Sequence, residues 1–373
     1  MKVCILSHCF YPSKKRGGPT VSIINMVRNL AEKLNLSVVT IIYDKDSDVP
    51  YDNVKVGKNR LFDSDVYYLQ DNSIKAFYDC IAEIQPDVIY VSSLFSYQYS
   101  IAALRYGRQH KNLRVVIAPR GELMPLALKR KKLIKQPFLS LVKMLMTDNT
   151  EFHVTSDEEE VALRKYFKNN RVWNIKNLPS KISAEGNSHA KSVGSLRIAM
   201  VGRIHPIKNV EYAIKLLNEI KGNVTLNIYG PEEDKKYVEL CKKAASELPD
   251  NIQVNFMGLI DHDSVGDELK KHHIFLSPTE SENYGHSIIE SLLCGIPAVI
   301  SCNTPWRNLK SSNAGYDIEL SDRKSFVEAL QAFVDMNEET YQLWSAGARK
   351  YINSGLAVEE TVNKYFEMLS RSE

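Results

Sequence analysis

Short apolar runs alternate with segments of helical period along most of the chain. The runs are rich in Val, Ile and Leu, as in strands buried on both faces of a parallel sheet. The segments between them repeat apolar residues every three or four positions, which indicates amphipathic helices. Strands are predicted at residues 2–7, 36–43, 87–91, 114–118, 151–155, 171–175, 196–201, 225–229, 252–257, 274–276 and 298–300, and helices at 21–34, 72–84, 97–108, 208–217, 234–248, 264–272 and 285–294. This alternation predicts an α/β fold with doubly wound parallel sheets.

A polar segment divides the chain into two parts. The 373 residues exceed the size of one ordinary domain and suit two. Residues 180–195 are rich in Ser, Gly, Asn and Lys and show no apolar period, which is typical of a linker. We therefore predict an N-terminal domain at residues 1–180 and a C-terminal domain at residues 181–357, followed by an amphipathic helix at residues 358–373.

Composition narrows the class of protein. A net charge of +3 gives no support for nucleic-acid binding. Six scattered cysteines lack the spacing of metal ligands, and several fall in apolar patterns, as buried thiols do in a reducing cytoplasm. No apolar run approaches the roughly 20 residues that cross a bilayer, and the N-terminal run is too short for a signal peptide. These features predict a cytoplasmic protein.

The most informative stretch lies between the predicted strands at 274–276 and 298–300. It forms a loop that contains Glu282, followed by a helix that contains Glu290. The N–H groups of Gly285, His286 and Ser287 open this helix, and such a helix start attracts a phosphate or diphosphate. Carboxylates on either side of a diphosphate can accept hydrogen bonds from sugar hydroxyls. The alternative is an ordinary surface helix preceded by an acidic loop. These residues alone do not decide between a phosphate site and such a helix.

The amino-acid sequence of this stretch resembles a known family motif. The run from Glu282 through Asn283, Tyr284 and Gly285 to Glu290, followed by Cys-Gly-Ile-Pro, is similar to the Glu-x7-Glu motif of the family-four retaining glycosyltransferases. The resemblance implies the GT-B architecture, with two Rossmann-like domains facing across a cleft and a last helix that returns to the first domain. It implies that Glu282 binds the hydroxyls of the donor sugar and that Glu290 binds the ribose of the nucleotide.

Further positions fit the same resemblance. Arg203 and Lys208 bracket the end of the strand at 196–201, where two cations can bind an anion; solvated charges at a turn are the alternative. The resemblance implies that both residues grip the donor diphosphate. It also implies that the Gly17-Gly18 loop reaches this diphosphate and that Leu259 meets the nucleotide base. Without the resemblance, the two glycines could equally serve only the turn.

The acceptor side departs from the family pattern. Many relatives carry a cleft histidine where this chain has Pro119-Arg120-Gly121. Arg120 and Gly121 are candidates for binding the acceptor or a phosphate, with a structural ion pair of Arg120 as the alternative. A basic segment at Lys129–Lys135 follows, in a helical stretch that Pro137 is expected to kink or divide. Its lysines could meet an anionic membrane surface, or the apolar stripe could simply join the core.

The resemblance implies a retaining transfer from a nucleotide-diphosphate sugar to a saccharide or lipid-linked saccharide, as in bacterial surface polysaccharide synthesis. Because fixed cations flank the expected diphosphate, we predict no metal or other cofactor. The acidic triplets at residues 44–48, 63–65 and 261–263 are taken as solubilising or capping residues. A sugar-nucleotide epimerase and a non-catalytic nucleotide-sugar binder remain as alternatives.

Overall fold

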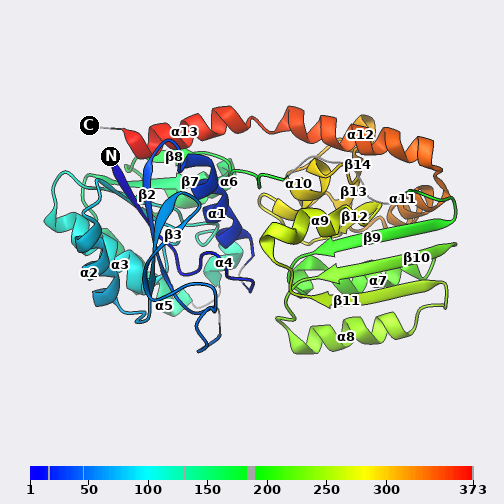
Figure 1. The fold of residues 1–373 in the computed structure, drawn as a ribbon, viewed down its shortest axis with the longest axis horizontal. Coiled ribbons are helices and arrows are strands. Elements are labelled where there is room, and N and C mark those ends of the chain that lie inside the picture. The colour runs from blue at the N-terminus through cyan, green and yellow to red at the C-terminus, as the bar shows by residue number, and fades with distance from the viewer. Residues whose placement is uncertain (16, 45, 130–131, 183–189, 372–373) are drawn as a thin grey trace. The chain divides into compact units, whose positions relative to one another are not determined.

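The chain forms two compact units. The structure is a computed structural model that describes residues 1–15, 17–44, 46–129, 132–182 and 190–371. One unit contains residues 1–178 together with the C-terminal segment 358–373, and the other contains residues 179–357. Each unit is an open sheet covered by helices on both faces, as Figure 1 shows.

The first unit is built on an eight-stranded sheet in the order β3-β4-β2-β1-β5-β6-β7-β8. All neighbouring strands are parallel except β3 and β4. Its elements are β1 (Lys2–Leu6), α1 (Gly18–Leu30), β2 (Asn35–Ile41), β3 (Gly57–Leu61), β4 (Ser64–Leu69), α2 (Ile74–Ile84), β5 (Val88–Val91), α3 (Tyr97–Gln109), β6 (Arg114–Ile117), α4 (Pro125–Lys129), α5 (Lys132–Leu145), β7 (Thr150–Val154), α6 (Asp157–Arg164), β8 (Val172–Asn174) and α13 (Val358–Ser370).

The second unit is built on a six-stranded, fully parallel sheet in the order β11-β10-β9-β12-β13-β14. Its elements are β9 (Ser195–Val201), the 3₁₀ turn η1 (Pro206–Lys208), α7 (Val210–Leu217), β10 (Asn223–Tyr229), α8 (Lys235–Ser246), β11 (Ile252–Gly258), η2 (His262–Ser264), α9 (Val265–Leu269), β12 (Ile274–Ser277), α10 (His286–Leu293), β13 (Ala298–Ser301), η3 (Lys310–Ser312), β14 (Gly315–Ile318), α11 (Arg323–Asp335) and α12 (Glu338–Gly355).

Two apolar cores lie on opposite faces of this second sheet. Successive side chains of β9 point to opposite faces, so that Ile198 packs in one core and Ala199 in the other. Residues of α7, α8 and α11 complete the first core, and residues of α9, α10 and α12 complete the second. The helix α10, which carries Glu290, the second glutamate of the Glu-x7-Glu motif, is therefore fixed against the sheet by its apolar residues Ile288, Ile289 and Leu292.

The C-terminal helix α13 belongs to the first unit, where a buried arginine holds its end. Arg114 on β6 makes a bidentate pair with Glu151 on β7, with N–O distances of 3.1 and 2.8 Å. The same guanidinium donates to the carbonyls of Met368 and Arg371, at 2.8 and 3.0 Å. These carbonyls lie at the end of a helix, where the helix dipole favours a positive charge. A single side chain thus joins two strands to the last helix.

The structure corrects several expectations. Residues 57–69 form a β3–β4 hairpin that was not predicted, and β3 pairs antiparallel with β4, so the first sheet is not wholly parallel. Pro137 lies inside α5 and does not divide it. Gly18 is the first residue of α1 and not part of the preceding loop. Lys208 ends η1, and the α-helix that it was expected to open begins at Val210.

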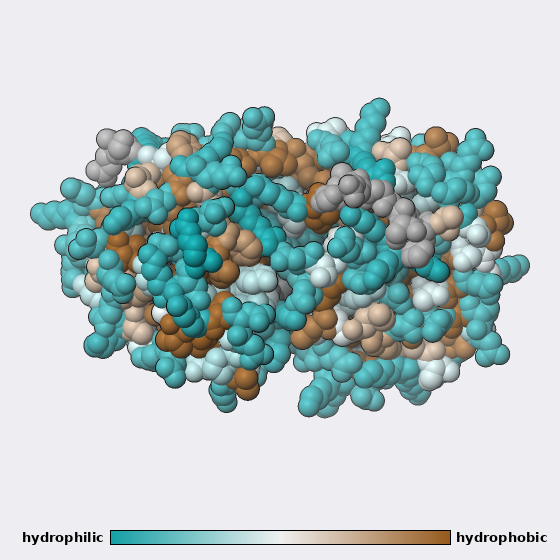
Figure 2. Space-filling view, viewed as in Figure 1, coloured by the Kyte–Doolittle hydropathy of each residue, from teal (hydrophilic) through white to brown (hydrophobic). Residues whose placement is uncertain are grey.

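The surface drawn in Figure 2 is mostly hydrophilic, with apolar side chains in scattered patches. None of the helices in the described part of the chain is both long enough and apolar enough to span a bilayer.

Candidate functional site

The loops after β9 and β12 carry the predicted cations and the first predicted carboxylate. These strands are neighbours in the sheet, although two other strands separate them along the chain. From β9 the sheet grows through β10 and β11 on one side and through β12 on the other. The carboxyl ends of β9 and β12 therefore form a topological switch point, where ligands of open α/β sheets bind.

Lys208 and Glu282 meet at this point. The Lys208 ammonium forms a salt bridge with the Glu282 carboxylate, and each side chain is 21% exposed. The backbone ties the same loops together, because Glu280 N–H donates to the carbonyl of Ile207 at 2.8 Å and the Thr279 hydroxyl donates to it at 2.8 Å. The predicted pairing of the two motifs in space is thus a property of the second unit by itself.

Arg203 lies at the same edge of the sheet and pairs with Glu233, from the loop after β10, at 2.6 Å. The turn that carries it requires glycine. Gly202 has φ +154° and Gly230 has φ +147°. A Cβ on Gly230 would lie 1.9 Å from the Gly202 carbonyl oxygen, so a side chain there would force the two strand ends apart. Each predicted diphosphate-binding cation therefore has a carboxylate partner in this structure.

The start of α10 is a crowded left-handed turn. Gly285 is its N-cap, with φ +76° and ψ +57°. A Cβ on Gly285 would lie 3.0 Å from Ile288 Cδ1 and 3.4 Å from both Glu282 Cγ and Trp306 Nε1. The N–H groups of the predicted phosphate site, at residues 285–287, thus lie next to the Glu282 side chain. Asn283 is exposed, and His286 and Ser287 are partly buried.

The aromatic residues around this turn form one group. The buried Tyr284 ring packs edge-on against His286, with centroids 4.9 Å apart, and against Trp306, with centroids 6.5 Å apart. Among the described residues, the Tyr284 hydroxyl has no hydrogen-bond partner, and burial raises its pKa. Trp306 was not singled out from the sequence. It follows β13 and was visible there only as one aromatic residue in a polar loop.

Glu290 is buried, at 4% exposure, on the second turn of α10. Its carboxylate accepts a hydrogen bond from the Ser180 hydroxyl at 2.7 Å. Burial raises the pKa of this carboxyl to about 7, against a lowering by the Ser180 hydrogen bond. A ribose that binds Glu290 must replace Ser180 or share the carboxylate with it.

Gly17 and Gly18 lie at the carboxyl edge of the first sheet. Gly17 is the N-cap of α1, and no described atom lies within 4 Å of the Cβ position built on it. Asp44 holds the loop before them by accepting from the Ser13 hydroxyl at 2.8 Å and from Lys14 N–H at 2.9 Å. The first aspartate of the acidic triplet at 44–48 is therefore engaged by its own chain.

Arg120 and Gly121 follow β6, with φ values of +53° and +77°. The Arg120 guanidinium donates to the Tyr90 hydroxyl at 2.9 Å and to the side-chain oxygen of Asn177. The Tyr90 hydroxyl lies 2.7 Å from His153 Nδ1, and the other ring nitrogen of His153 lies 2.9 Å from the Ile175 carbonyl. Burial, together with the charge of Arg120, lowers the pKa of His153 to about 3, so this histidine is neutral. Arg120 thus takes part in a buried network within its own unit.

The remaining predicted residues lie apart from these groups. Leu259 follows the edge strand β11 and is 43% exposed. Within the basic segment at 129–135, residues 130–131 fall outside the described residues; Lys135 itself donates to the Ala127 carbonyl at 2.7 Å. Asp65 of the second acidic triplet pairs with Lys58 across the hairpin at 2.8 Å. Within the described ranges, no three His, Cys, Asp or Glu side chains lie together as a metal site would require.

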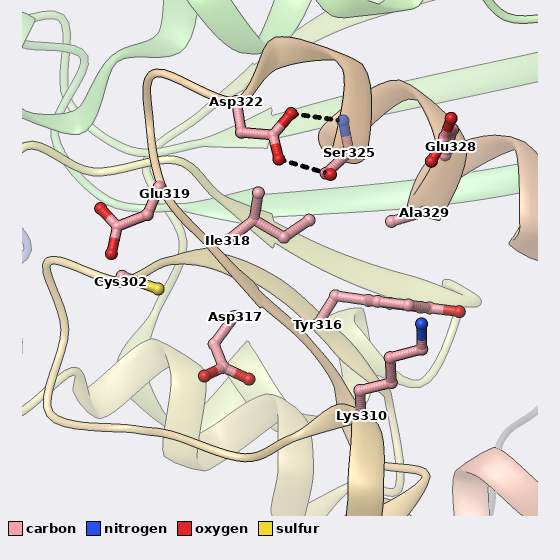
Figure 3. A pocket seen from close by; sticks show the side chains of 10 residues that line it. All are labelled: Cys302, Lys310, Tyr316, Asp317, Ile318, Glu319, Asp322, Ser325, Glu328 and Ala329. Carbon is pink, nitrogen blue, oxygen red and sulfur yellow. Dashed lines mark hydrogen bonds between the residues drawn. The ribbon is translucent and has the colours of Figure 1, made fainter.

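A cavity of about 390 Å³ lies at the ends of β13 and β14 and the start of α11. Figure 3 shows its lining, which includes four acidic side chains, Asp317, Glu319, Asp322 and Glu328. Two of these carboxylates accept hydrogen bonds from nearby backbone and side-chain groups of the same unit. Asp322 caps α11 through Ser325, and Asp317 accepts the N–H groups of Asn308 and Leu309, at 3.0 and 2.9 Å. The cavity therefore borders the loop that carries Trp306.

The glycosyl transferases group 1 family matches residues 182–351, almost the whole second unit. Residues 182–351 belong to this family. A curated relative, the alpha-monoglucosyldiacylglycerol synthase of Streptococcus pneumoniae, is 28% identical over 173 residues, which are 45% of this chain and 37% of the relative. The chain thus matches little more than a third of that relative's length.

Two solved structures are similar in fold across both units of the chain. WaaG, a glycosyltransferase involved in lipopolysaccharide biosynthesis, is 13% identical with a TM-score of 0.68 over 99% of each chain. Alr3699/HepE of Anabaena in complex with UDP-glucose is 15% identical with a TM-score of 0.69, also over 99% of each chain. At these identities the likeness concerns the fold, and it confirms the predicted GT-B architecture.

The crowding at the start of α10 predicts a difference between two glycine substitutions. Gly258 and Gly285 share a left-handed φ, of +74° and +76°, but no described atom lies within 4 Å of a Cβ on Gly258. Gly258→Ala should lower the free energy of unfolding by about 1 kcal/mol through backbone strain alone. Gly285→Ala should cost at least about 1 kcal/mol more, because its Cβ also meets Ile288. Urea denaturation measures both losses, and equal losses would show that the turn has room to spare.

Proposed function

We propose that the protein is a retaining glycosyltransferase that moves a sugar from a nucleotide-diphosphate donor to an acceptor hydroxyl. The observation that carries this proposal is the meeting of Lys208 and Glu282 at the switch point of the second sheet, beside the start of α10. The likeness of the fold to HepE with bound UDP-glucose supports a nucleotide sugar as donor. The match to the group 1 family supports sugar transfer.

The proposed chemistry uses fixed positive charge. As the bond from the sugar to the diphosphate breaks, negative charge grows on the leaving phosphate. Arg203, Lys208 and the N–H groups at the start of α10 stabilise that charge without having to reorganise. A divalent metal would duplicate this role, so we propose that transfer is metal-independent.

Glu282 has a different role in this proposal. Its carboxylate, released from Lys208 when the diphosphate takes the lysine, accepts hydrogen bonds from the donor sugar's hydroxyls. Glu290 likewise exchanges the Ser180 hydroxyl for a ribose hydroxyl. The acceptor hydroxyl attacks on the face from which the diphosphate leaves, and the configuration at the sugar carbon is retained. No covalent intermediate with the protein is part of the proposal.

Two other activities share the same donor site. An epimerase would release an altered nucleotide sugar or free sugar without needing an acceptor. A non-catalytic binder would hold the nucleotide sugar unchanged. Two results together distinguish the transferase from both: release of the nucleoside diphosphate depends on an added acceptor, and NMR of the product shows the anomeric configuration that the donor had.

For the acceptor we propose a saccharide or lipid-linked saccharide of a bacterial surface polymer. WaaG supports a surface polysaccharide, and the pneumococcal synthase, named for a glucosyl diacylglycerol, supports a lipid acceptor. In the described part of the first unit, Ile134 and Met144 on α5 are 69% and 63% exposed. Apolar side chains in a basic helical stretch suit peripheral contact with an anionic membrane.

Donor binding should require both cations and no metal. Isothermal titration calorimetry with UDP, GDP and ADP should show that one of the three nucleotides binds tightly to the wild-type protein. The Kd of this nucleotide should rise about 10- to 100-fold in Arg203→Ala and in Lys208→Ala, the range expected for the loss of a charge-assisted contact. Lys215→Ala, which removes only an exposed salt bridge with Glu211 on the same helix, should leave the Kd unchanged.

Glu282→Ala should abolish sugar transfer while the protein remains folded. A strict need for magnesium in the presence of these cations would refute the charge argument.

Binding of the nucleotide should depend on pH through Glu290. Because ribose hydroxyls prefer the ionised carboxylate, the affinity should fall about tenfold per pH unit below pH 7. The folded protein holds this proton up to about pH 7 and the unfolded chain only to about pH 4.5. The contribution of Glu290 to the unfolding free energy is therefore present at low pH and is lost as the pH rises through 7. Glu290→Gln should remove the contribution of this carboxyl to the pH dependence of both nucleotide affinity and unfolding free energy. Only the pH dependence that comes from protonation of the nucleotide phosphates should remain in the binding data. A wild-type pH profile identical to that of Glu290→Gln would contradict the role.

Membrane contact through α5 predicts binding to anionic vesicles. In a vesicle sedimentation assay, the wild-type protein should co-sediment with phosphatidylglycerol vesicles. A smaller fraction should co-sediment with phosphatidylcholine vesicles. Ile134→Glu should lose several-fold in binding because it puts a like charge and a polar group into the contact. Val161→Glu, at a comparably exposed position of α6 in the same unit, is the matched control. Equal effects of the two substitutions would argue against α5 as the contact.

A further inference from the structure

We propose that Trp306 is a positioning residue that fixes the direction of the Gly285 N–H group, so that this group meets the diphosphate of the donor. The inference rests on the proposed function and extends it to a residue outside the Glu-x7-Glu motif. Trp306 lies in the loop after β13, which crosses beside the start of α10.

One hydrogen bond sets the orientation of the peptide between Tyr284 and Gly285. The indole N–H of Trp306 donates to the backbone carbonyl of Tyr284 at 2.8 Å. The peptide bond between Tyr284 and Gly285 is planar and trans, so its N–H points opposite to its carbonyl. By holding the carbonyl on its own side, Trp306 directs the N–H of Gly285 away from itself. Rotation of this one peptide would instead turn a carbonyl oxygen toward a bound phosphate.

Trp306 is itself held firmly. Tyr351 on α12 brackets the next residue, Arg307, by donating to its carbonyl at 2.8 Å and accepting from its N–H at 3.2 Å. Asp317, seen in Figure 3, holds the following two N–H groups of the same loop. The loop also reaches the motif directly, because Glu282 N–H donates to the Asn303 carbonyl at 3.0 Å. The loop after β13 therefore braces the Glu282 loop at both ends.

The close packing at Gly285 supports the same conclusion. The position of a Cβ on Gly285 lies 3.4 Å from both Trp306 Nε1 and Glu282 Cγ. The indole thus lies against the very turn that joins the proposed sugar-binding carboxylate to the first N–H groups of α10. A hydrogen bond from a backbone N–H to a phosphate is charge-assisted, and its loss weakens binding by about tenfold or more.

The test compares matched tryptophan substitutions. Trp306→Phe keeps an aromatic ring but removes the N–H donor. Trp344→Phe, in the apolar cluster with Tyr316 and Phe333, is the control in the same unit. Tyr351→Phe loosens the loop without changing Trp306 and serves if Trp306→Phe does not fold. Titration with UDP and UMP, or with the GDP and GMP or ADP and AMP pairs, gives the gain in affinity from the second phosphate. Hydrogen exchange of residues 279–290 reports the loop without any ligand.

Trp306→Phe should reduce the diphosphate-to-monophosphate affinity ratio about tenfold while leaving monophosphate binding within about threefold. It should also speed exchange in residues 279–290, with Tyr351→Phe acting in the same direction and Trp344→Phe changing neither readout. An equal loss for both nucleotides, or unchanged exchange, would overturn the inference and leave the proposed function standing. Failure of the wild-type protein to bind any of the three diphosphates would overturn the proposed function, and the role of Trp306 with it.

Discussion

The salt bridge between Lys208 and Glu282 is the interaction around which the proposed donor site of the second unit is arranged. It requires two loops, 74 residues apart in the chain, to end side by side. The reversal of strand order between β9 and β12 provides this, and the hydrogen bonds from Glu280 N–H and the Thr279 hydroxyl to the Ile207 carbonyl hold the two loops together. The pair is partly shielded from water, so the attraction is stronger than between exposed charges, yet a ligand can still reach it.

The site is balanced in charge before any ligand binds. Arg203 and Lys208 each face a carboxylate, from Glu233 and Glu282. A diphosphate brings more negative charge than one carboxylate and more acceptor oxygens, so it can displace both partners. Glu282 then becomes available to the sugar. In the same way, a ribose hydroxyl replaces the Ser180 hydroxyl on Glu290. Binding of each part of the donor thus breaks one contact within the protein.

The sequence predicted the parallel sheets and the strand ends that carry Arg203 and Glu282, because apolar runs and helical periods are local signals. The β3–β4 hairpin escaped because its turn uses Phe62 and Asp63 at φ values of +50° and +55°, where Asn or Gly is the usual signal. The part played by Trp306 could not be predicted either. Its partner is a main-chain carbonyl 22 residues away, and no side-chain pattern encodes such a contact.

A crystal structure of the protein with a bound UDP-sugar would show whether these exchanges occur. We expect a diphosphate in contact with Arg203, Lys208 and the N–H groups at the start of α10. We also expect Glu282 to have turned from Lys208 to the sugar, and Glu290 to accept a hydrogen bond from the ribose. A nucleotide bound elsewhere on the second unit, with the Lys208–Glu282 salt bridge intact, would contradict this expectation.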